Sequence, residues 1–528
     1  MLMVGVRQSF LGISPPGVYA DISMNNLDRP SLLRLNPADN VAVAMRRIRA
    51  GEMLESGCVV ALADAPSGHK IAIEGILRGD PVRKYGQVIG VATQDIAPGA
   101  HVHTHNLATS DLRGMPPAAQ WRGRQEPERT FGGYRRENGK VGVRNYVGVL
   151  TSVNCSATVA RHIAEAAERS GLLADYPNVD GIVPITHASG CGMAGSGEGF
   201  EVLRRTLWGT AANPNFGAVI LVGLGCEVVQ IGRLMADYGL EEGRTFRAFT
   251  IQDAGGTRRA IDEGLRQLNS MLPEANRAAR TPTPASEIVL GLQCGGSDAW
   301  SGVTSNPALG VASDRLVALG GAVILSETPE IYGAEHLLIA RASPSVSDKL
   351  RKRLAWWEDY TRRNGAVMDN NPSPGNKVGG LTTILEKSLG AVAKAGTSPL
   401  MEVVEYAEPI KARGLVFMDS PGFDPCSATG QVASGATLIA FTTGRGSAFG
   451  CKPSPSIKLS SNSEIYRRMA DDIDVDCGPI ALGDATIEEK GAEILDYLLE
   501  VASGRRSKSE ALGYGGVEFV PWQIGATM

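Results

Sequence analysis

The stretch Ala218-Val219-Ile220-Leu221-Val222-Gly223-Leu224-Gly225-Cys226-Glu227 is an apolar strand that runs into a glycine-rich turn. Short apolar runs bounded by glycine are typical of strands that are buried on both faces of a sheet. The same pattern recurs at 147–150, 181–185, 288–292 and 322–325, with helical stretches between the runs. We therefore predict α/β units with mainly parallel sheets.

Two other regions extend this pattern. Apolar runs at 415–418 and 438–441 again end in polar, glycine-containing turns, which indicates a second Rossmann-like α/β unit. Near the start, short strands are punctuated by glycine and proline and indicate a small β-rich domain. The expected division of the chain is a β-rich domain over 36–107, a linker over 108–130, a metal-binding and catalytic α/β domain over 131–398, a C-terminal α/β domain over 399–503 and a tail over 504–528.

The composition limits the class of protein. The 528 residues carry a net charge of −4, which gives no reason to expect nucleic acid or a membrane as a partner. No apolar run approaches the roughly 20 residues that span a bilayer. Eight cysteines spread through a long chain are typical of reduced thiols in a cytoplasmic protein. We expect a cytoplasmic protein that binds a small molecule and assembles into a homo-oligomer, most simply a dimer.

Cysteines follow four of the predicted strands. Ligands of open α/β sheets bind outside the carboxyl ends of the strands, so residues at these positions are candidates for a site. Thiolate and imidazole ligands suit iron(II), zinc or an iron–sulfur centre. The alternative is that the cysteines are small core residues, and no CxxC pair is present to decide. The candidate ligands are Cys155, His187, Cys191, Cys226 and Cys294.

Histidines form a second candidate group. His101, His103 and His105 alternate along the chain and share one face if this segment is an extended strand. His69 belongs to the same small domain. Imidazoles gathered in this way suit acid–base chemistry, although an exposed polar strand face is the alternative.

Three loops offer groups that bind anions. The proline-stiffened segment 370–380 supplies Asn371, Asn376 and Lys377, and glycines flank Arg445 in the segment 442–447. An ordinary rigid turn is the alternative for the first of these loops. The turn after the run at 288–292 adds Ser297 and Asp298. Neither a Walker loop nor a dinucleotide fingerprint is present in the sequence.

Taken together, several motifs resemble the altronate/galactarate dehydratases and the related sulfolactate sulfo-lyases, over about residues 39–478. Each motif is weak alone, and the combination is specific. The motifs are Gly68-His69-Lys70, Lys84-Tyr85-Gly86, His101 to Asn106, Gly139-Lys140-Val141-Gly142-Val143-Arg144-Asn145, His187 with Gly190-Cys191, Gly223 to Glu227, Cys294 to Asp298, Asn371 to Lys377 and Thr443-Gly444-Arg445-Gly446.

The resemblance implies an N-terminal SAF (β-clip) domain and a hydro-lyase that converts a hexonate or hexarate into a 2-keto-3-deoxy acid. It also implies a divalent metal, typically iron(II), with manganese(II) or an iron–sulfur centre left open. We hypothesise that a base removes the C2 proton of a metal-bound acid and that an acid protonates the departing 3-hydroxyl. The expected roles are catalytic for His69, His101, His103 and Lys377, substrate-binding for Asn371, Asn376, Arg445, Ser297 and Asp298, and metal-binding for Cys155, His187, Cys191, Cys226 and Cys294.

The leaving group and the reaction have alternatives. The segment 419–425 looks closer to the sulfo-lyases, which would expel sulfite, whereas 327–335 looks closer to the altronate branch. A sugar-acid-binding protein without catalytic activity is the third possibility. In either enzyme the small domain is expected to close over the large one and place the site at their interface.

Overall fold

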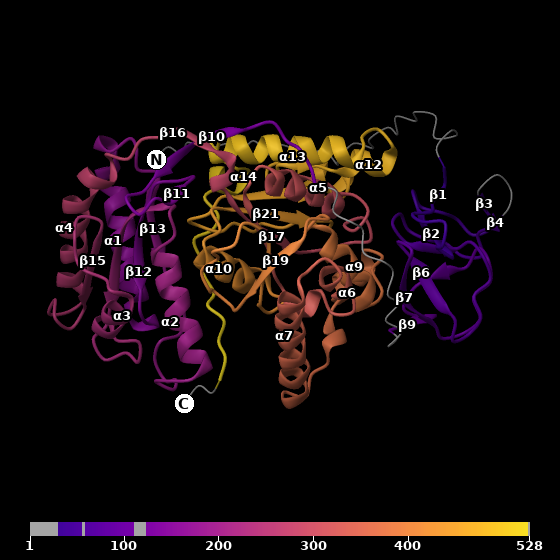
Figure 1. Ribbon diagram of the computed structural model, residues 1–528, viewed down its shortest axis with the longest axis horizontal. Coiled ribbons are helices and arrows are strands. Elements are labelled where there is room, and N and C mark those ends of the chain that lie inside the picture. Colours follow the sequence, from indigo (N-terminus) through magenta and orange to yellow (C-terminus); the bar gives the residue numbers. More distant parts are fainter. Residues whose placement is uncertain (1–29, 55–58, 110–122, 526–528) are drawn as a thin grey trace, which may run out of the picture.

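The computed structural model describes residues 30–54, 59–109 and 123–525, and Figure 1 shows three domains in a row. The β-rich N-terminal domain lies at one end, the second domain at the other, and the C-terminal domain between them. The N-terminal domain is thus separated in space from the second domain, which follows it in sequence. Residues 110–122 of the expected linker lie outside the described residues.

The N-terminal domain consists of short antiparallel strands, as predicted. Its sheets have the strand orders β1-β2-β5-β8 and β6-β7-β9, with β3 and β4 as a separate pair. Buried apolar side chains such as Ile71, Val82 and Ile89 fill the space between them. The strands are β1 (Leu32–Leu33), β2 (Val41–Ala44), β3 (Met53–Leu54), β4 (Val59–Val60), β5 (Lys70–Ala72), β6 (Pro81–Lys84), β7 (Gln87–Ala92), β8 (His101–Val102) and β9 (Leu107–Ala108).

The second domain is built on a parallel four-stranded sheet with the order β13-β12-β14-β15. Helices α1 and α4 pack on one face of the sheet, and α2 and α3 pack on the other. The antiparallel strands β10, β11 and β16 form a separate small sheet. The elements are β10 (Thr130–Arg135), β11 (Val141–Gly142), β12 (Tyr146–Thr151), α1 (Ala157–Arg169), β13 (Gly181–Ile185), α2 (Glu198–Ala211), β14 (Phe216–Gly223), α3 (Ile231–Tyr238), β15 (Phe246–Thr250), α4 (Thr257–Ala275) and β16 (Thr281–Pro284).

The C-terminal domain contains a parallel seven-stranded sheet with the order β19-β20-β18-β17-β21-β22-β23. Helices α5 and α13 cover one face, and α10 covers the other and packs in turn against α2 of the second domain. The elements are β17 (Val289–Cys294), α5 (Ser305–Ala318), β18 (Ala322–Leu325), α6 (His336–Ile339), α7 (Pro344–Arg363), α8 (Pro374–Val378), α9 (Ile384–Ala393), β19 (Leu400–Val404), β20 (Gly414–Met418), α10 (Asp424–Ser434), β21 (Leu438–Thr443), β22 (Ser456–Ser460), α11 (Ser463–Arg468), β23 (Val475–Asp476), α12 (Gly478–Leu482), α13 (Ile487–Ala502) and α14 (Lys508–Ala511).

The seven-stranded sheet does not respect the domain boundary that we expected at residue 398. Strands β17 and β18 precede residue 398, yet they pair with β21 and β20, which follow it. A boundary at 398 therefore cuts through one sheet. The periodicity locates strands but not their partners, because parallel neighbours are joined by long crossovers. The expected tail is also ordered in part, since it forms α14 and buries Trp522 against the core.

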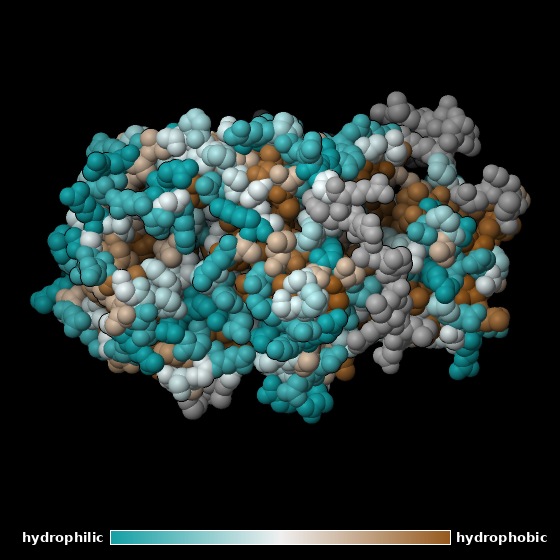
Figure 2. Space-filling view, in the orientation of Figure 1, coloured by the Kyte–Doolittle hydropathy of each residue, from teal (hydrophilic) through white to brown (hydrophobic). Residues whose placement is uncertain are grey.

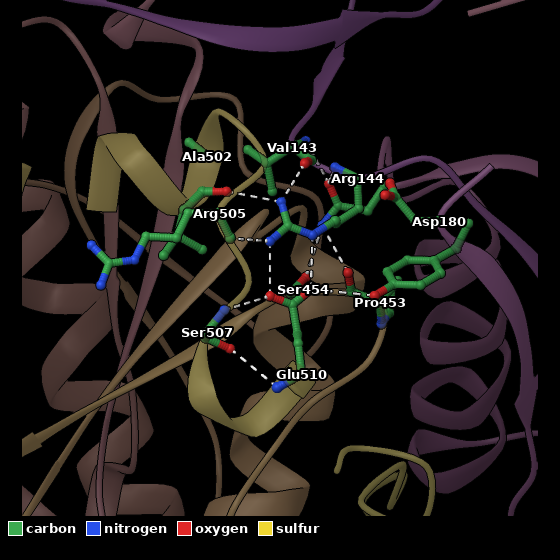
Figure 3. A network of polar contacts seen from close by, with 12 residues as sticks. Val143, Arg144, Asp180, Pro453, Ser454, Ala502, Arg505, Ser507 and Glu510 are labelled. Carbon is green, nitrogen blue, oxygen red and sulfur yellow. Dashed lines mark hydrogen bonds and ion pairs between the residues drawn. The ribbon is translucent and has the colours of Figure 1, made fainter. Parts of the chain in front are cut away.

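The second and C-terminal domains are joined by a buried arginine. The Arg144 guanidinium donates to both carboxylate oxygens of Glu510, at 2.7 and 2.8 Å, and to the backbone carbonyls of Val143, Val501 and Arg505 (Figure 3). Arg144 belongs to the motif 139–145, and Glu510 lies in α14. The motif thus fixes the position of one domain on the other, and an arginine suits this role because its planar donors bind a carboxylate in two places.

The surface is largely polar over the two α/β domains on the face shown in Figure 2, whereas apolar residues are prominent over the N-terminal domain. Met53, Leu62 and Leu77 of that domain are exposed by 65, 58 and 64%. Among the described residues, no helix is both long and apolar enough to cross a bilayer.

Candidate functional site

A cluster of acids and one thiol lies at the carboxyl edge of the seven-stranded sheet. Cys294 ends β17, and Glu327 and Glu330 follow β18. One ligand atom from each lies within 4.8 Å of the others, and all three residues are buried. Asp424 begins α10 and packs against the loop after Cys294, because a Cβ added at Gly295 would lie only 2.6 Å from an Asp424 oxygen. We call Cys294, Glu327, Glu330 and Asp424 the acid cluster.

Two lysines, Lys387 of α9 and Lys394 directly after the last residue of this helix, face the acid cluster. They lie seven residues apart, which puts them on the same side of a helix. Lys387 forms a close ion pair with Glu330. The Lys394 ammonium donates to the Cys294 sulfur at 2.9 Å and lies 3.8 Å from a Glu327 oxygen. Two cations thus offset part of the negative charge that the sheet edge buries.

The buried environment shifts the pKa values of these groups. Burial raises the pKa of Glu327 well above its usual range, and the neighbouring Glu330 raises it further. Burial, together with Glu330, raises the pKa of Asp424 to about 7. Burial raises the pKa of the Cys294 thiol to about 12. Burial alone would lower the pKa of Lys394, but Cys294 and Glu327 raise it, so the side chain stays cationic.

Several oxygens of this site have no hydrogen-bond partner within the described part of the chain. They are both carboxylate oxygens of Glu327, Oδ1 of Asp424 and Oδ1 of Asn371. Buried polar atoms are normally satisfied, so such a group points to a missing positive charge or donor. Thiolate and carboxylate donors suit a divalent transition metal. The acid cluster can therefore hold a metal ion.

The four histidines of the N-terminal domain lie together, but His101, His103 and His105 do not share a strand as expected. β8 ends at Val102, and the following residues form a turn. His69 and His101 are joined at 2.9 Å between ring nitrogens, and the rings of His103 and His105 lie within 6 Å of the ring of His101. The rings are therefore brought together by the tertiary fold and not by alternation along one strand.

Two of these histidines contact the C-terminal domain. His69 Nε2 lies 3.3 Å from the Val378 carbonyl oxygen, and His103 Nε2 lies 2.9 Å from that of Lys377. Burial lowers the pKa of His69 to about 4 and that of His101 to about 3, so both rings are neutral near pH 7. Through these contacts the histidines dock the N-terminal domain on the C-terminal end of α8.

A buried charge cluster strengthens the same interface. Lys70 and Lys84 each place their ammonium 2.9 Å from the carboxylate of Glu386 in α9. Burial alone would raise the pKa of Glu386, but the two lysines lower it and keep the carboxylate charged. Glu386 is adjacent in sequence to Lys387. The N-terminal domain therefore fixes the helix that carries the two lysines of the site.

The predicted substrate-binding residues are divided by the structure. Asn371 donates to Glu330 at 2.9 Å and so belongs to the acid cluster region. Asp298 is buried and accepts hydrogen bonds from Ser301, Ser461 and Asn462, which ties the loop after β17 to the loop after β22. Because its carboxylate oxygens accept hydrogen bonds from other residues of the fold, Asp298 has a structural role.

The remaining predicted residues border the site at different depths. The Asn376 side chain accepts from the backbone N–H of Ser373, the N-cap of α8, and donates to the Ser297 carbonyl at 2.7 Å, so its amide is used within the fold. Ser297 lines a small cavity with Cys294 and Lys387. Lys377 is half-buried in α8, and the Arg445 side chain is exposed. The backbone N–H of Arg445 donates to the Gly296 carbonyl oxygen at 2.8 Å.

The five predicted metal ligands do not meet at one place. Cys294 belongs to the seven-stranded sheet, whereas Cys155, Cys191, Cys226 and His187 follow strands of the four-stranded sheet. The ring of His187 is also engaged, because Nε2 lies 3.0 Å from the Thr151 carbonyl oxygen and Nδ1 accepts from the Ser189 backbone N–H. Because the four cysteines follow successive strands, we expected them at the edge of one sheet. The strands instead belong to two sheets.

Sequence reasoning missed the acidic and basic members of the site. Glu327 follows a predicted strand in the same way as the cysteines, so its position held a usable signal. Glu330 and Asp424 lay within motifs that we quoted for other reasons. Lys387 and Lys394 gave no signal, because lysines at helical spacing are common on solvated faces.

Comparison with known proteins identifies the family of this chain. The chain is 35% identical over 485 residues to altronate dehydratase of Bacillus subtilis, with 90% of this chain and 95% of the relative covered. It is 38% identical over 496 residues to galactarate dehydratase (L-threo-forming) of Escherichia coli, with 90% and 93% covered. The chain belongs to the altronate/galactarate dehydratase family.

Family models agree with this assignment and with the three domains. The altronate/galactarate dehydratase SAF domain matches residues 30–110, the second domain of D-galactarate dehydratase/altronate hydrolase matches 133–276, and the C-terminal domain of D-galactarate/altronate dehydratase matches 285–527. The subunit beta of (2R)-sulfolactate sulfo-lyase from Chromohalobacter salexigens is 34% identical over 393 residues, covering 73% of this chain and 96% of that subunit. The predicted family, the α/β fold with an N-terminal SAF domain and the assignment as a sugar-acid dehydratase of the hydro-lyase class are confirmed.

Proposed function

We propose that this dehydratase removes water from an aldonate or aldarate, of the altronate or galactarate type, at the acid cluster. The observation that supports this site is a set of buried carboxylates with unpartnered oxygens that face two lysines. Such a site provides both a proton acceptor and a positive field for an anionic substrate. Its position beside the SAF domain also matches the expectation of a site at a domain interface.

In this proposal Asp424 carries the proton. A pKa near 7 suits a group that must accept a proton and release it again near neutral pH. The Asp424 carboxylate takes the C2 proton, and the electron pair of the C2–H bond moves into the substrate carboxylate. The C3–O bond then breaks, and the departing hydroxide takes the proton from Asp424 and leaves as water. The enol that remains rearranges to the 2-keto acid.

Lys387 and Lys394 stabilise the negative charge that develops on the substrate. Both are buried cations, so their field is screened less than that of surface lysines. Iron(II), or alternatively manganese(II), held by Cys294, Glu327 and Glu330 would add a positive charge that binds the substrate carboxylate and acidifies the C2 proton. We propose iron(II), because the donor set combines one soft thiolate with two carboxylates.

Lys377 and Arg445 remain candidates for binding the remote part of the substrate, and Asn371 for orienting it beside Glu330. His69, His101 and His103 are proposed to position helix α8, which carries Lys377. This differs from direct acid–base catalysis by the histidines. Conservative replacement of His103 by glutamine preserves a donor to the Lys377 carbonyl, so a docking role predicts partial rescue relative to alanine.

An assay over a panel of hydroxy-acids tests the proposed function. Aldonates, aldarates and 3-sulfolactate are incubated with anaerobically purified enzyme and iron(II), and 2-keto acid and sulfite are measured. We expect 2-keto acid from a hexonate or hexarate without sulfite. Sulfite from sulfolactate alone would favour the sulfo-lyase, and binding without turnover of any acid would favour a binding protein.

Two further points are proposals. We propose that two copies assemble, because the exposed side chains of Met53, Leu62 and Leu77 would be covered by association. Light scattering after size exclusion measures the number of copies.

We also propose a cytoplasmic location, because the exposed thiols of Cys155, Cys191 and Cys226 suit a reducing compartment.

A further inference from the structure

The hairpin between β6 and β7 of the N-terminal domain carries a tyrosine at its tip. The two strands are antiparallel and Lys84 pairs with Gln87, so Tyr85 and Gly86 are the two residues of the turn. Tyr85 has a φ of +63° and Gly86 a φ of +69°. Glycine, asparagine and aspartate are the usual residues at the first of these positions, because a bulky side chain is strained there. The chain thus keeps an aromatic residue at a position whose backbone disfavours it.

Contacts from both domains hold Tyr85 in this conformation. The buried carboxylate of Asp39 accepts from the Tyr85 backbone N–H at 3.2 Å and from that of Gly86 at 2.7 Å. The Tyr85 ring packs against Trp300 of the C-terminal domain. A Cβ added at Gly302 would lie 2.6 Å from the Tyr85 hydroxyl, so the hydroxyl occupies the space that a side chain would need. Strained residues persist where their surroundings fix them in this way, and they gather at functional sites.

Tyr85 lines the small cavity that also borders the acid cluster. Cys294 and Lys387 line the same cavity, and so does Gly302, beside which the Tyr85 hydroxyl lies. The volume of the cavity is about 10 Å³. This is about the space of one water molecule, so the cavity admits one oxygen atom of a ligand and not a whole sugar acid. The N-terminal domain therefore contributes a side chain to an oxygen-sized space beside the proposed site.

The hydroxyl of Tyr85 is available as a hydrogen-bond donor in this cavity. The two carboxylates that line the cavity, Asp298 and Glu386, are already engaged by hydrogen bonds and ion pairs. The Lys84 ammonium hydrogen-bonds to the Tyr85 hydroxyl, and because an ammonium can only donate, it leaves the hydroxyl hydrogen for another partner. Burial raises the pKa of Tyr85, so the hydroxyl keeps its hydrogen near neutral pH.

We infer that the Tyr85 hydroxyl and the Lys387 ammonium form an oxyanion hole at this cavity, so that the N-terminal domain supplies a catalytic residue. The inference rests on the proposed dehydration at the acid cluster. As the C2 proton moves to Asp424, negative charge collects on the substrate carboxylate, one oxygen of which enters the cavity. The Tyr85 hydroxyl donates a hydrogen bond to this oxygen and keeps its own proton, so the proton transfers through Asp424 are unchanged. A donor that the fold holds in place stabilises this oxygen more as its charge grows.

The change Tyr85→Phe in the full-length enzyme separates this role from simple docking of the N-terminal domain. Phenylalanine keeps the ring against Trp300 and removes only the hydroxyl. We expect kcat for a hexonate or hexarate to fall about 10²- to 10³-fold with KM little changed, as for the loss of one oxyanion-hole donor. Hydrogen exchange of the α9 amides should stay as in the wild type, because Lys70 and Lys84 still hold this helix.

The matched control is Tyr406→Phe, which removes a buried hydroxyl that donates to the Cys426 carbonyl at 2.8 Å in the core of the C-terminal domain. We expect this variant to unfold at a lower temperature and to keep a kcat close to that of the wild type. If Tyr85→Phe does not fold, Gly302→Ala takes its place, because the added methyl group displaces the Tyr85 hydroxyl. The same fall of kcat with unchanged exchange of α9 is then expected.

An unchanged kcat in the folded variant would overturn the inference. So would a loss of kcat that comes with faster exchange of the α9 amides, because weakened docking would then explain the loss. A wild type that turns over none of the hydroxy-acids contradicts the proposed dehydration itself. A wild type that is active and no faster than Tyr85→Phe contradicts only the role of Tyr85, so the two failures are distinguishable.

Discussion

The carboxyl edges of the two parallel sheets carry similar sequence but differ in chemistry. At the four-stranded sheet, Cys226 is exposed, and both oxygens of the neighbouring Glu227 accept hydrogen bonds from Ser152 and Gly225. At the seven-stranded sheet, Cys294 is buried, and the oxygens of Glu327 have no hydrogen-bond partner among the described residues. A satisfied carboxylate holds loops in place, whereas an unsatisfied one in a buried site is available to a ligand.

The difference arises from what covers each edge. Helix α9 closes over the seven-stranded edge and brings Lys387 and Lys394, and the SAF domain fixes α9 through Lys70 and Lys84. At the four-stranded edge the cysteines remain exposed. Burial therefore creates shifted pKa values at one edge and leaves accessible thiols at the other. The difference favours proton chemistry at the edge of the seven-stranded sheet.

The largest expected effect separates Asp424 from Glu227. The change Asp424→Asn removes the proposed proton carrier, and we expect kcat to fall about 10²- to 10⁴-fold while the protein stays folded. The matched change Glu227→Gln should alter thermal stability more than kcat, because Glu227 is used within the fold. Steady-state kinetics and thermal unfolding measure both. A comparable loss of kcat in Glu227→Gln would break the distinction between the two edges.

The second prediction concerns the cations of α9. The change Lys387→Met removes the ammonium that pairs with Glu330, and we expect kcat/KM to fall about 10²- to 10³-fold because a positive charge at the anionic intermediate is lost. Lys387→Arg keeps the charge and should recover part of the activity. Kinetics with one hexonate under saturating iron(II) measures the two variants. Equal activity of the methionine and arginine variants would show that the charge is not required.

The third prediction uses thiol reactivity. In native, metal-free protein, we expect Cys294 to react with iodoacetamide at least about 100-fold more slowly than Cys155, Cys191 and Cys226. Cys294 is buried and its pKa is raised to about 12, so little thiolate forms at neutral pH. Mass spectrometry of digested protein after timed labelling measures each rate.

The smallest expected effect is a pH dependence of kcat/KM. A base acts in its deprotonated form, and burial raises the pKa of Asp424 to about 7. We therefore expect kcat/KM to level off above this pH and to fall about tenfold for each pH unit below it. The residual activity of Asp424→Asn should lack this limb. An unchanged limb in that variant would assign the titration to another group.

Much of the fold followed from the sequence. The apolar runs placed β12, β13, β14, β17 and β18 close to their observed bounds. The reason is physical, because a strand buried on both faces needs a continuous apolar run that ends where the chain meets solvent. The motifs also identified the family. The pairing of β17 with β21 was not accessible in this way, because the connection between parallel strands is long and leaves no local pattern.

The site was only partly accessible from the sequence. Residues that follow strands could be named, and Cys294 and Asn371 indeed lie at the acid cluster. The sequence by itself determined which polar side chains stand at strand ends. Only the tertiary structure decided which strand ends share a sheet and which edge α9 and the SAF domain cover. Both Glu327 and Glu227 are buried, and what separates them is hydrogen bonding, a property of the packed chain that leaves Glu327 without partners and satisfies Glu227.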